Sequence, residues 1–396
     1  MRLLHTSDWH LGRSFHGVGM LDAQRDFVDQ LVFLVEARAV DVVLIAGDVY
    51  DRALPGLDVV KLLDDALVRI THAGASVVLT SGNHDSAIRL GFASRLLERG
   101  GVHLRTRVEE LDVPVVFPLE TDANTGDKNS AGEVAIYGIP YLEPRLVAER
   151  LGAASANHFD VTLAAVDRIR SDVQRRRESG PVHPVVLAHT FASGGITSDS
   201  ERDLSIGGLG AVPLDLFEDF AYTALGHLHG RQELAPNVRY SGSPLAYSFS
   251  EAMHHKGAWL VDIDASGAVE IEEVRWDAPR ALATLRGQLD DLLGSPDHAW
   301  AEGAYCQVTL TDAQRPAQAM EKVRTRFPDT LVLSFDPQGA EVRTRTSYSN
   351  RLAEAKDDLE VCCGFLEHVR DRRSGDAEEA ALREALEAVR LEEGEL

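Results

Sequence analysis

The chain has 396 residues, 44% of them hydrophobic, and its 63 acidic and 40 basic side chains leave a net charge of −23. The length indicates two or three domains, and the composition excludes collagen-like, disulfide-scaffold and wholly disordered proteins. The acidic surplus argues against a protein that grips nucleic acid mainly by neutralising phosphates with Lys and Arg.

Residues 1–276 alternate short apolar runs with amphipathic stretches, which predicts a layered α/β domain. Apolar residues at helical spacing predict helices around 27–35 and 59–70, and the polar stretch 118–133 predicts an exposed loop. The predicted strands are Leu3–Thr6, Val42–Ala46, Val77–Leu79, Val134–Ile139, Val185–Ala188 and Tyr222–Leu225, followed by a closing hairpin of Gly257–Ile263 and Ala268–Arg275.

Two smaller units are expected after this domain. Residues 280–345 predict a small α/β domain with a helix near 280–293, a strand at 305–310, a helix at 316–327 and a strand at 330–335. Residues 348–396 hold only helical pattern, which predicts a tail of two amphipathic helices around a turn at 372–376.

The cysteines and the apolar runs indicate the compartment. Cys306 and the adjacent Cys362 and Cys363 give no disulfide framework, as is typical of a reducing cytoplasm. The N-terminus lacks the apolar stretch of a signal peptide, and the longest apolar runs are strand-sized. We therefore expect a cytoplasmic protein.

Five short motifs place metal-ligand side chains directly after predicted strands. Because ligands bind at the carboxyl ends of strands in open α/β sheets, the motifs are expected to meet at one edge. The Asp8/His10 and His227/His229 spacings fit extended chain, where alternate side chains point the same way, and the motif glycines permit sharp turns. The motifs are Asp8-Trp9-His10, Gly47-Asp48-Val49-Tyr50-Asp51, Gly82-Asn83-His84-Asp85, His189 and Gly226-His227-Leu228-His229.

The residue types indicate the chemistry. Asp, Asn and His donors suit Mn, Fe or Zn better than Ca. Two such metals, roughly 3.5–4 Å apart, neutralise a phosphate, activate water and stabilise the leaving oxygen. A carboxylate between them can bridge both, and Asp48 is placed to do so. Any one motif has a structural explanation, such as a hydrogen-bonded core histidine, but the set predicts a two-metal phosphoesterase.

These motifs resemble the calcineurin-like metallophosphoesterase superfamily. Within this superfamily, four segments are similar to the SbcD family of bacterial nucleases, which are relatives of the double-strand-break repair nucleases. They are Ser7–Gly12, Gly47–Asp51, Tyr240–Pro244 and Ser248–Glu251. The resemblance implies a layered β-sandwich flanked by helices, a capping domain at 280–345 and a helical docking tail at 348–396.

Carried over by position, the resemblance implies the site residues. One metal would be held by Asp8, His10, His229 and the bridging Asp48, and the other by Asp48, Asn83, His189 and His227. The implied catalytic residue is His84, which would face the scissile phosphate and protonate or stabilise the leaving oxygen. Asp51 and Asp85 are expected to orient ligands rather than to bind metal.

The implied function is DNA cleavage with two divalent ions, usually Mn²⁺, in nucleoid-associated repair and recombination. It comprises 3′-to-5′ exonuclease activity on duplex ends and endonuclease activity on single strands and hairpins. The implied partners are an SMC-like ATPase of the SbcC type and a second copy of this chain, in a heterotetramer.

Two alternatives to the nuclease stay open. The chain could be a small-molecule phosphatase or phosphodiesterase of the same superfamily, or a non-catalytic scaffold that binds DNA ends or a partner. The basic run Arg168–Arg177 fits either a solvated helix face or a phosphate contact.

Overall fold

The computed structural model describes residues 1–119, 132–204, 210–338, 357–370 and 374–394. Contacts divide the chain into two compact units, one of residues 1–309 with 318–334 and one of residues 310–317 with 335–396. Most of the predicted loop at 118–133 and part of the predicted turn at 372–376 lie outside the described residues. The domain boundaries 1–276, 280–345 and 348–396 stay predictions.

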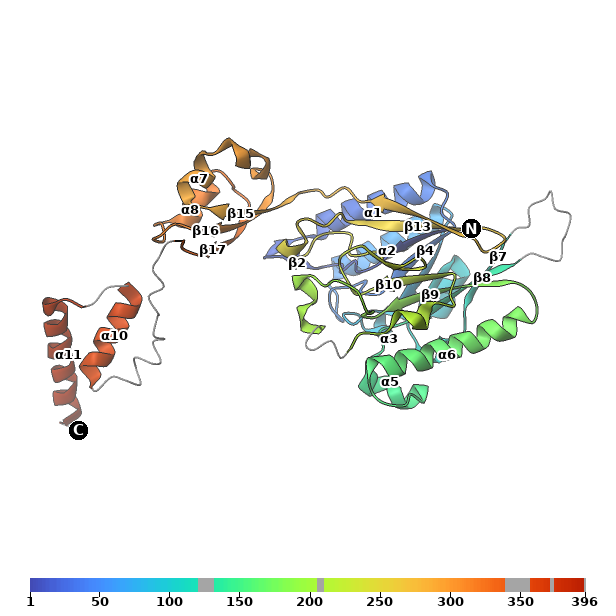
Figure 1. Cartoon of the computed structure of the whole chain (residues 1–396), viewed down its shortest axis with the longest axis horizontal. Coiled ribbons are helices and arrows are strands. Elements are labelled where there is room, and N and C mark those ends of the chain that lie inside the picture. The colour runs from blue at the N-terminus through green and yellow to red at the C-terminus, as the bar shows by residue number, and fades with distance from the viewer. Residues whose placement is uncertain (120–131, 205–209, 339–356, 371–373, 395–396) are drawn as a thin grey trace. The chain divides into compact units, whose positions relative to one another are not determined.

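Two six-stranded sheets form the main part of the larger unit (Figure 1). The first has the order β14-β13-β1-β4-β5-β6, with β1, β4, β5 and β6 parallel. The second has the order β11-β12-β10-β9-β8-β7, with β12, β10, β9 and β8 parallel. The bounds are β1 Arg2–Thr6, β4 Val42–Ala46, β5 Ser76–Thr80, β6 Val102–Arg105, β7 Val115–Pro118, β8 Glu133–Ile139, β9 Val182–His189, β10 Tyr222–Gly226, β11 Gln232–Ala235, β12 Val238–Tyr240, β13 Gly257–Ile263 and β14 Val269–Arg275; a small ribbon pairs β2 Ser14–Phe15 with β3 Val18–Gly19.

Alternate residues of the central strands enter different cores. In β4, Val42 and Leu44 belong to the core that the two sheets share, whereas Val43 and Ile45 belong to the core shared with the helices. A strand buried on both faces needs an unbroken apolar run. This explains why the central strands could be located in the sequence.

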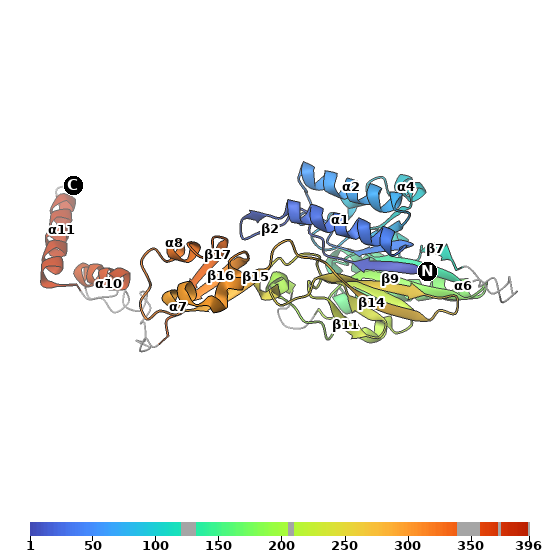
Figure 2. The same cartoon turned by 90° about the horizontal axis from the view of Figure 1, so that it is seen from above.

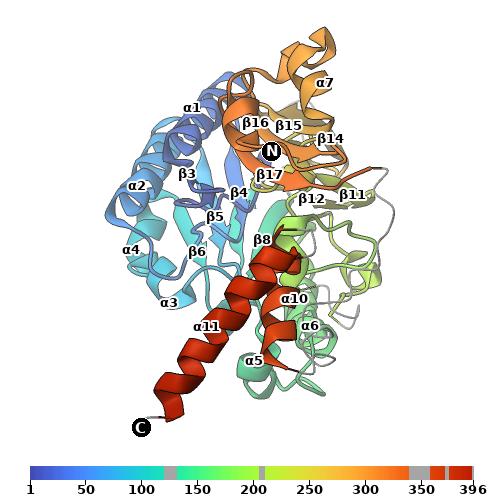
Figure 3. The ribbon, with the colours of Figure 1, turned by 90° about the vertical axis from the view of Figure 1, so that its left-hand side faces the viewer.

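Helices cover the outer faces of both sheets. The helices α1 (Leu21–Ala37) and α2 (Leu57–His72) lie over the first sheet (Figure 2). The second sheet carries α5 (Pro144–Leu151) and α6 (His158–Arg177) on the opposite side (Figures 1 and 3). The short helices α3 (Ala87–Leu90) and α4 (Ser94–Leu97) follow β5. The predicted layered α/β sandwich is therefore confirmed.

The small α/β fold beyond the sandwich differs in part from the prediction. Its sheet has the order β15-β16-β17, with β15 Leu282–Gly287, β16 Tyr305–Leu310 and β17 Thr330–Phe335, and its helices are α7 Leu289–Gly294 and α8 Ala319–Arg324. The predicted helix at 280–293 is wrong over its first half. There, buried Ala283 and Leu285 alternate with exposed Thr284 and Arg286, as they do in a strand.

The C-terminal residues form two helices, as predicted. These are α10 (Asp358–Arg370) and α11 (Asp376–Gly394), and they contact each other. Within the ranges that the structure describes, no helix has the length and apolar character needed to cross a membrane.

The basic run on α6 is engaged in ion pairs. Arg170 pairs with Asp219 at 3.0 Å, and Arg175 and Arg176 both pair with Asp172, at 2.8 and 2.6 Å. Tyr137 on β8 donates to the same Asp172 carboxylate at 2.8 Å. Because local carboxylates neutralise these arginines, the structure favours a helix face over a phosphate contact.

We expect Asp172→Asn to lower the stability of the protein. Burial raises the pKa of Asp172, but Arg176 and the other donors outweigh it and hold that pKa below its ordinary value. Losing hydrogen bonds to a charged group costs about 1.5–3 kcal/mol, a fall in melting temperature of roughly 3–10 °C.

The pKa of Asp172 is lower in the folded than in the unfolded protein. Its contribution to stability is therefore fully present above the pKa of the unfolded state, about 3.9, and is lost as the pH falls through the pKa of the folded state. Calorimetry of wild type and variant at pH 7, 5 and 4 checks this. The difference in melting temperature between wild type and Asp172→Asn should be largest at pH 7. A difference that is larger at pH 4 would contradict a stabilising role of the Asp172 carboxylate.

Candidate metal centre

The carboxyl ends of β1, β4, β5, β9 and β10 bring the predicted side chains together. Ligand atoms of three overlapping groups lie within 4.8 Å of one another: Asp8 with His10 and His229, Asp8 with Asp48 and His189, and His10 with Asp48 and His84. All of these are buried except His84, which is half-buried, as is Asn83.

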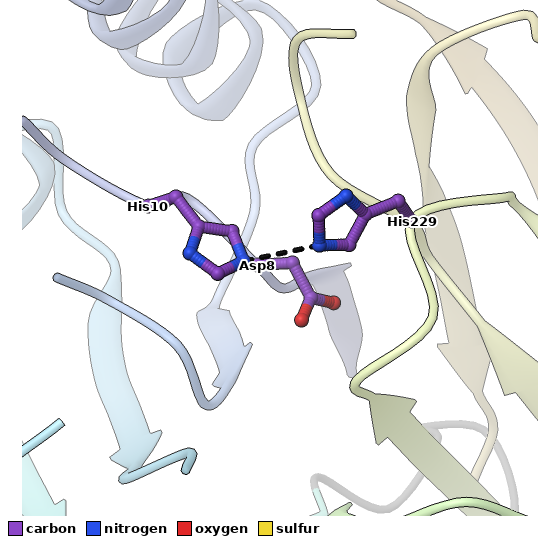
Figure 4. A group of neighbouring side chains, drawn as sticks. All are labelled: Asp8, His10 and His229. Carbon is purple, nitrogen blue, oxygen red and sulfur yellow. Dashed lines mark hydrogen bonds between the residues drawn. The ribbon is translucent and has the colours of Figure 1, made fainter. Parts of the chain in front are cut away.

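The first cluster is formed by Asp8, His10 and His229. The Nε2 atoms of His10 and His229 face each other at 3.1 Å, with the Asp8 carboxylate beside them (Figure 4). The Ser7 hydroxyl donates to Asp8 at 2.5 Å, and the backbone N–H of His227 donates to it at 3.0 Å. Two imidazole nitrogens and a fixed carboxylate aimed at one point suit a shared cation.

The second cluster is formed by Asn83, His189 and His227. Asn83 Oδ1 lies 3.0 Å from His189 Nε2 and 3.2 Å from His227 Nδ1, and those two nitrogens are 3.3 Å apart. His189 Nδ1 donates to the carbonyl of Ala46 at 2.9 Å, which leaves Nε2 as the atom with a free lone pair when the ring is neutral. Three atoms that can bind a metal ion, one oxygen and two nitrogens, therefore converge on one point.

Asp48 lies between the two clusters. Its Oδ2 is 3.6 Å from His10 Nε2 and 3.4 Å from His189 Nε2. Its Oδ1 accepts the backbone N–H of His84 at 2.9 Å. The structure thus places this carboxylate where it could reach both cations.

Left-handed backbone at the site corrects the expectation of extended chain. The φ angle is +53° at Asp8, +44° at His10, +48° at Asp48 and +110° at His227. Such angles cost of order 1–3 kcal/mol each for residues other than glycine and persist only where the surrounding structure imposes them. The side chains converge because the backbone turns at these residues, and not because alternate strand residues share a face.

At two motif glycines a side chain would collide with neighbouring atoms, although the backbone there does not need the left-handed conformation that favours glycine. A Cβ on Gly226 would lie 1.8 Å from the carbonyl oxygen of Ala46, and a Cβ on Gly82 would lie 2.1 Å from Asp48 Oδ1. Neither glycine has a positive φ, whereas Gly47 does, at +82°. The loop that carries Asn83 can therefore approach Asp48, and the loop that carries His227 can approach Ala46, only without a side chain at these positions.

Charges at the site compensate one another. Burial, with the nearby Asp48 carboxylate, raises the pKa of Asp8 to about 7. Burial lowers the pKa of His10 to about 4 and that of His227 to about 3, so both rings are neutral donors. Burial would also lower the pKa of His189, but Asp48 outweighs it and raises that pKa to about 9. Two carboxylates, an amide and mostly neutral imidazoles fit a pair of divalent cations.

The remaining predicted residues, His84, Asp51 and Asp85, lie beside the two clusters. His84 Nδ1 contacts the carbonyl of Asp51 at 3.0 Å, and its ring stands at 90° to that of His10. Asp85 accepts backbone N–H groups of three residues, at Val49, Tyr50 and Gly82, at 2.9–3.1 Å, so it ties two motif loops together. Asp51 Oδ1 lies 3.6 Å from His10 Nδ1.

Several supporting residues were not predicted from the sequence. Gln24 on α1 donates to the His10 carbonyl at 2.8 Å and to the Tyr247 hydroxyl at 3.0 Å. Tyr247 in turn donates to the Trp9 carbonyl at 2.6 Å. Gln24 has no spacing that marks it, and Tyr247 lies between the segments Tyr240–Pro244 and Ser248–Glu251 that carried part of the resemblance.

Mn²⁺ is expected to raise the melting temperature of the protein. An ion at 100 times its dissociation constant stabilises the folded state by about 2.7 kcal/mol, or roughly 5–10 °C for a domain of this size. EDTA should reverse the shift, and Ca²⁺ should give a smaller one because imidazole nitrogens suit it poorly. Thermal unfolding that is insensitive to Mn²⁺, Fe²⁺ and Zn²⁺ alike would contradict a metal centre.

Two family models match the chain. Residues 1–230 match calcineurin-like phosphoesterase, and this range contains every residue of both clusters. Residues 278–370 match the SbcD_C model, described as the type 5 capsule protein repressor C-terminal domain.

Solved structures with distant similarity include three proteins. A dimetal phosphatase from Danio rerio is 11% identical with a TM-score of 0.41, and 69% of this chain covers 96% of it. GAP50, the anchor in the inner membrane complex of Plasmodium, is 9% identical with a TM-score of 0.40, with coverages of 86% and 99%. TT1561 of Thermus thermophilus is 12% identical with a TM-score of 0.36, with coverages of 69% and 99%. Scores this low add nothing to the family match.

Proposed function

We propose that this chain, which belongs to the calcineurin-like phosphoesterase family, is a metal-dependent nuclease that hydrolyses phosphodiester bonds of DNA. Family membership and the buried His and Asp cluster make the chain a metal-dependent phosphoesterase. The step to DNA is supported by the second match, the SbcD_C model over residues 278–370. A phosphatase for small molecules has no need of this additional domain.

The two clusters supply the proposed ligands. We assign one cation to Asp8, His10, His229 and Asp48, and the other to Asp48, Asn83, His189 and His227, with Mn²⁺ as the expected ion. When bound, the cations supply Lewis acidity toward the phosphate and lower the pKa of water. Asp8 and Asp48 make the ligand sets acidic, and divalent cations held there would outweigh these carboxylates locally, which a net charge of −23 does not reveal.

The residues of the chain perform the remaining tasks. Asp48 fixes the spacing of the two ligand sets, because one carboxylate faces both. His84 is the proposed proton donor to the leaving oxygen. The Asp51 carbonyl only accepts hydrogen bonds, so His84 Nδ1 carries a hydrogen and Nε2 is the atom that holds or gives the catalytic proton.

The proposed assembly is a heterotetramer. The tail at 348–396 would dock an SMC-like ATPase of the SbcC type through the apolar residues of α10 and α11. Two copies of the chain would join two ATPase subunits. Because the chain is strongly acidic, the ATPase is expected to supply most of the grip on DNA.

End-labelled linear duplex DNA and a DNA hairpin test this proposal. With Mn²⁺, and with the ATPase partner present or absent, the chain is expected to shorten the duplex from its 3′ ends and to open the hairpin, and EDTA should stop both. Hydrolysis of p-nitrophenyl phosphate or of cyclic nucleotides without DNA cleavage in either condition would favour the small-molecule enzyme. Mn²⁺ binding without any hydrolysis would favour the scaffold.

A further inference from the structure

The buried end of the segment Tyr240–Glu251 has no task in the chemistry proposed above. The segment ends in a 3-10 turn, η5 (Phe249–Glu251), and Glu251 lies completely buried behind His229 beside the buried Lys256. We propose that Glu251, held by Lys256, is a positioning residue that fixes His229 toward the cation shared with Asp8 and His10. This inference rests on the proposed two-metal centre.

The two ring nitrogens of His229 have different neighbours, which gives each nitrogen a different role. Nδ1 lies 3.4 Å from Glu251 Oε1, and Nε2 faces His10 Nε2 at 3.1 Å (Figure 4). A carboxylate only accepts hydrogen bonds, so Glu251 favours the tautomer with its hydrogen on Nδ1. That tautomer leaves the Nε2 lone pair free for a cation and makes the imidazole a better donor.

Lys256 fixes Glu251 relative to the backbone of His229. Its ammonium donates to Glu251 Oε2 at 2.5 Å, to Ser243 Oγ at 2.9 Å and to the carbonyl oxygen of His229 at 2.8 Å. All three ammonium hydrogens therefore have an acceptor. Because one ammonium binds both the carboxylate and the ligand's own carbonyl, it sets the distance between Glu251 and the imidazole.

Further contacts hold the same carboxylate and the same backbone. Glu251 Oε1 accepts from the hydroxyl of Ser200, and Oε2 accepts from the backbone N–H of Tyr247 at 3.4 Å. A second buried carboxylate, Glu201, accepts the backbone N–H of His229. These contacts fix the Glu251 carboxylate and the backbone of His229, so the carboxylate stays beside Nδ1 of the ring.

Stability alone is a weak explanation for this buried pair. The cost of taking two charges out of water offsets their attraction, and apolar replacements of similar volume are often neutral or stabilising. Orienting groups behind a metal-bound histidine typically change metal affinity by 10–100-fold. Glu251 and Lys256 have the geometry of such groups.

The test compares Glu251→Gln with the double variant Glu251→Leu/Lys256→Met. The double variant removes both charges together and leaves neither one buried alone, whereas Glu251→Gln keeps an acceptor oxygen near Nδ1. Glu270→Gln, at an exposed glutamate on β14, is the matched control. The melting temperature without metal shows whether each variant folds. Equilibrium binding gives the number of Mn²⁺ ions bound and their affinities, and electron paramagnetic resonance shows whether the bound ions form a coupled pair.

We expect wild type and Glu270→Gln to bind two Mn²⁺ ions with the spectrum of a coupled pair. The double variant should bind one ion with unchanged affinity and the other 10–100-fold more weakly, and it should show the spectrum of an isolated ion at intermediate Mn²⁺ concentrations. Glu251→Gln should show a smaller loss of the same affinity.

Two tight Mn²⁺ ions in the double variant would overturn the positioning role and leave the pair purely structural. If the double variant does not fold, the positioning role is overturned instead by a Glu251→Gln variant that binds both Mn²⁺ ions with wild-type affinity. A wild type that binds no Mn²⁺ would refute the proposed metal centre itself, which is a distinct result.

Discussion

Asp48→Asn is expected to lower Mn²⁺-dependent cleavage of duplex DNA by about 10³-fold or more. The Asp48 carboxylate faces both clusters, with Oδ2 at 3.6 Å from His10 Nε2 and 3.4 Å from His189 Nε2. Asn keeps the shape but removes the negative charge. If the paired cations contribute several kcal/mol to catalysis, each 1.36 kcal/mol lost is a factor of ten in rate.

Cleavage of end-labelled duplex at saturating Mn²⁺ checks the Asp48 prediction, together with equilibrium Mn²⁺ binding. Tight binding of a second ion should be lost in the variant. Asp290→Asn is the matched control, because Asp290 is an exposed carboxylate on α7. Near-wild-type cleavage by Asp48→Asn would show that this carboxylate does not join the two sites.

His84→Gln is expected to separate chemistry from metal binding. Loss of a proton donor typically costs 10²–10⁴-fold in rate when the leaving oxygen needs a proton, as the sugar oxygen of DNA does. p-Nitrophenolate leaves without protonation, so hydrolysis of bis-p-nitrophenyl phosphate should fall less than about tenfold. Both Mn²⁺ ions should remain bound.

The His84 prediction is checked by measuring kcat on both substrates and Mn²⁺ binding in wild type, His84→Gln and His72→Gln. His72 is an exposed histidine at the end of α2, so its variant should behave as wild type. Loss of a Mn²⁺ ion in His84→Gln would make His84 a ligand, as its proximity to His10 and Asp48 allows. Equal DNA cleavage by wild type and His84→Gln would assign the activity to a contaminant.

Most strands of the sandwich could be predicted because their burial leaves a direct mark on the sequence, whereas the short strands β6, β7, β11 and β12 were not predicted. The run Val42–Ala46 is apolar throughout since both faces of β4 are covered. The strand β15 could not be predicted, because leucines stand at helical spacing across this strand and the helix that follows it. These leucines are Leu282, Leu285, Leu289 and Leu292. Local periodicity does not show where one element ends and the next begins.

The ligand motifs could be predicted for a different reason. Asp8 and Asp48 follow β1 and β4, which are neighbouring parallel strands of the first sheet, so these two residues had to lie near one another once the strands were located. His189 ends β9 of the second sheet, and the packing of the two sheets brings it to them. The positive φ angles of Asp8 and Asp48 and the contacts of Gln24 and Glu251 depend on packing between segments far apart in the chain. Spacing within one motif carries no record of such contacts.

Anomalous diffraction from a crystal of the full chain grown with Mn²⁺ tests the two-metal centre most directly. The expected result is two peaks about 3.5–4 Å apart on either side of the Asp48 carboxylate, one near His10 and His229 and one near Asn83, His189 and His227. A single peak, or peaks that Asp48 does not touch, would contradict the centre on which the proposed nuclease depends.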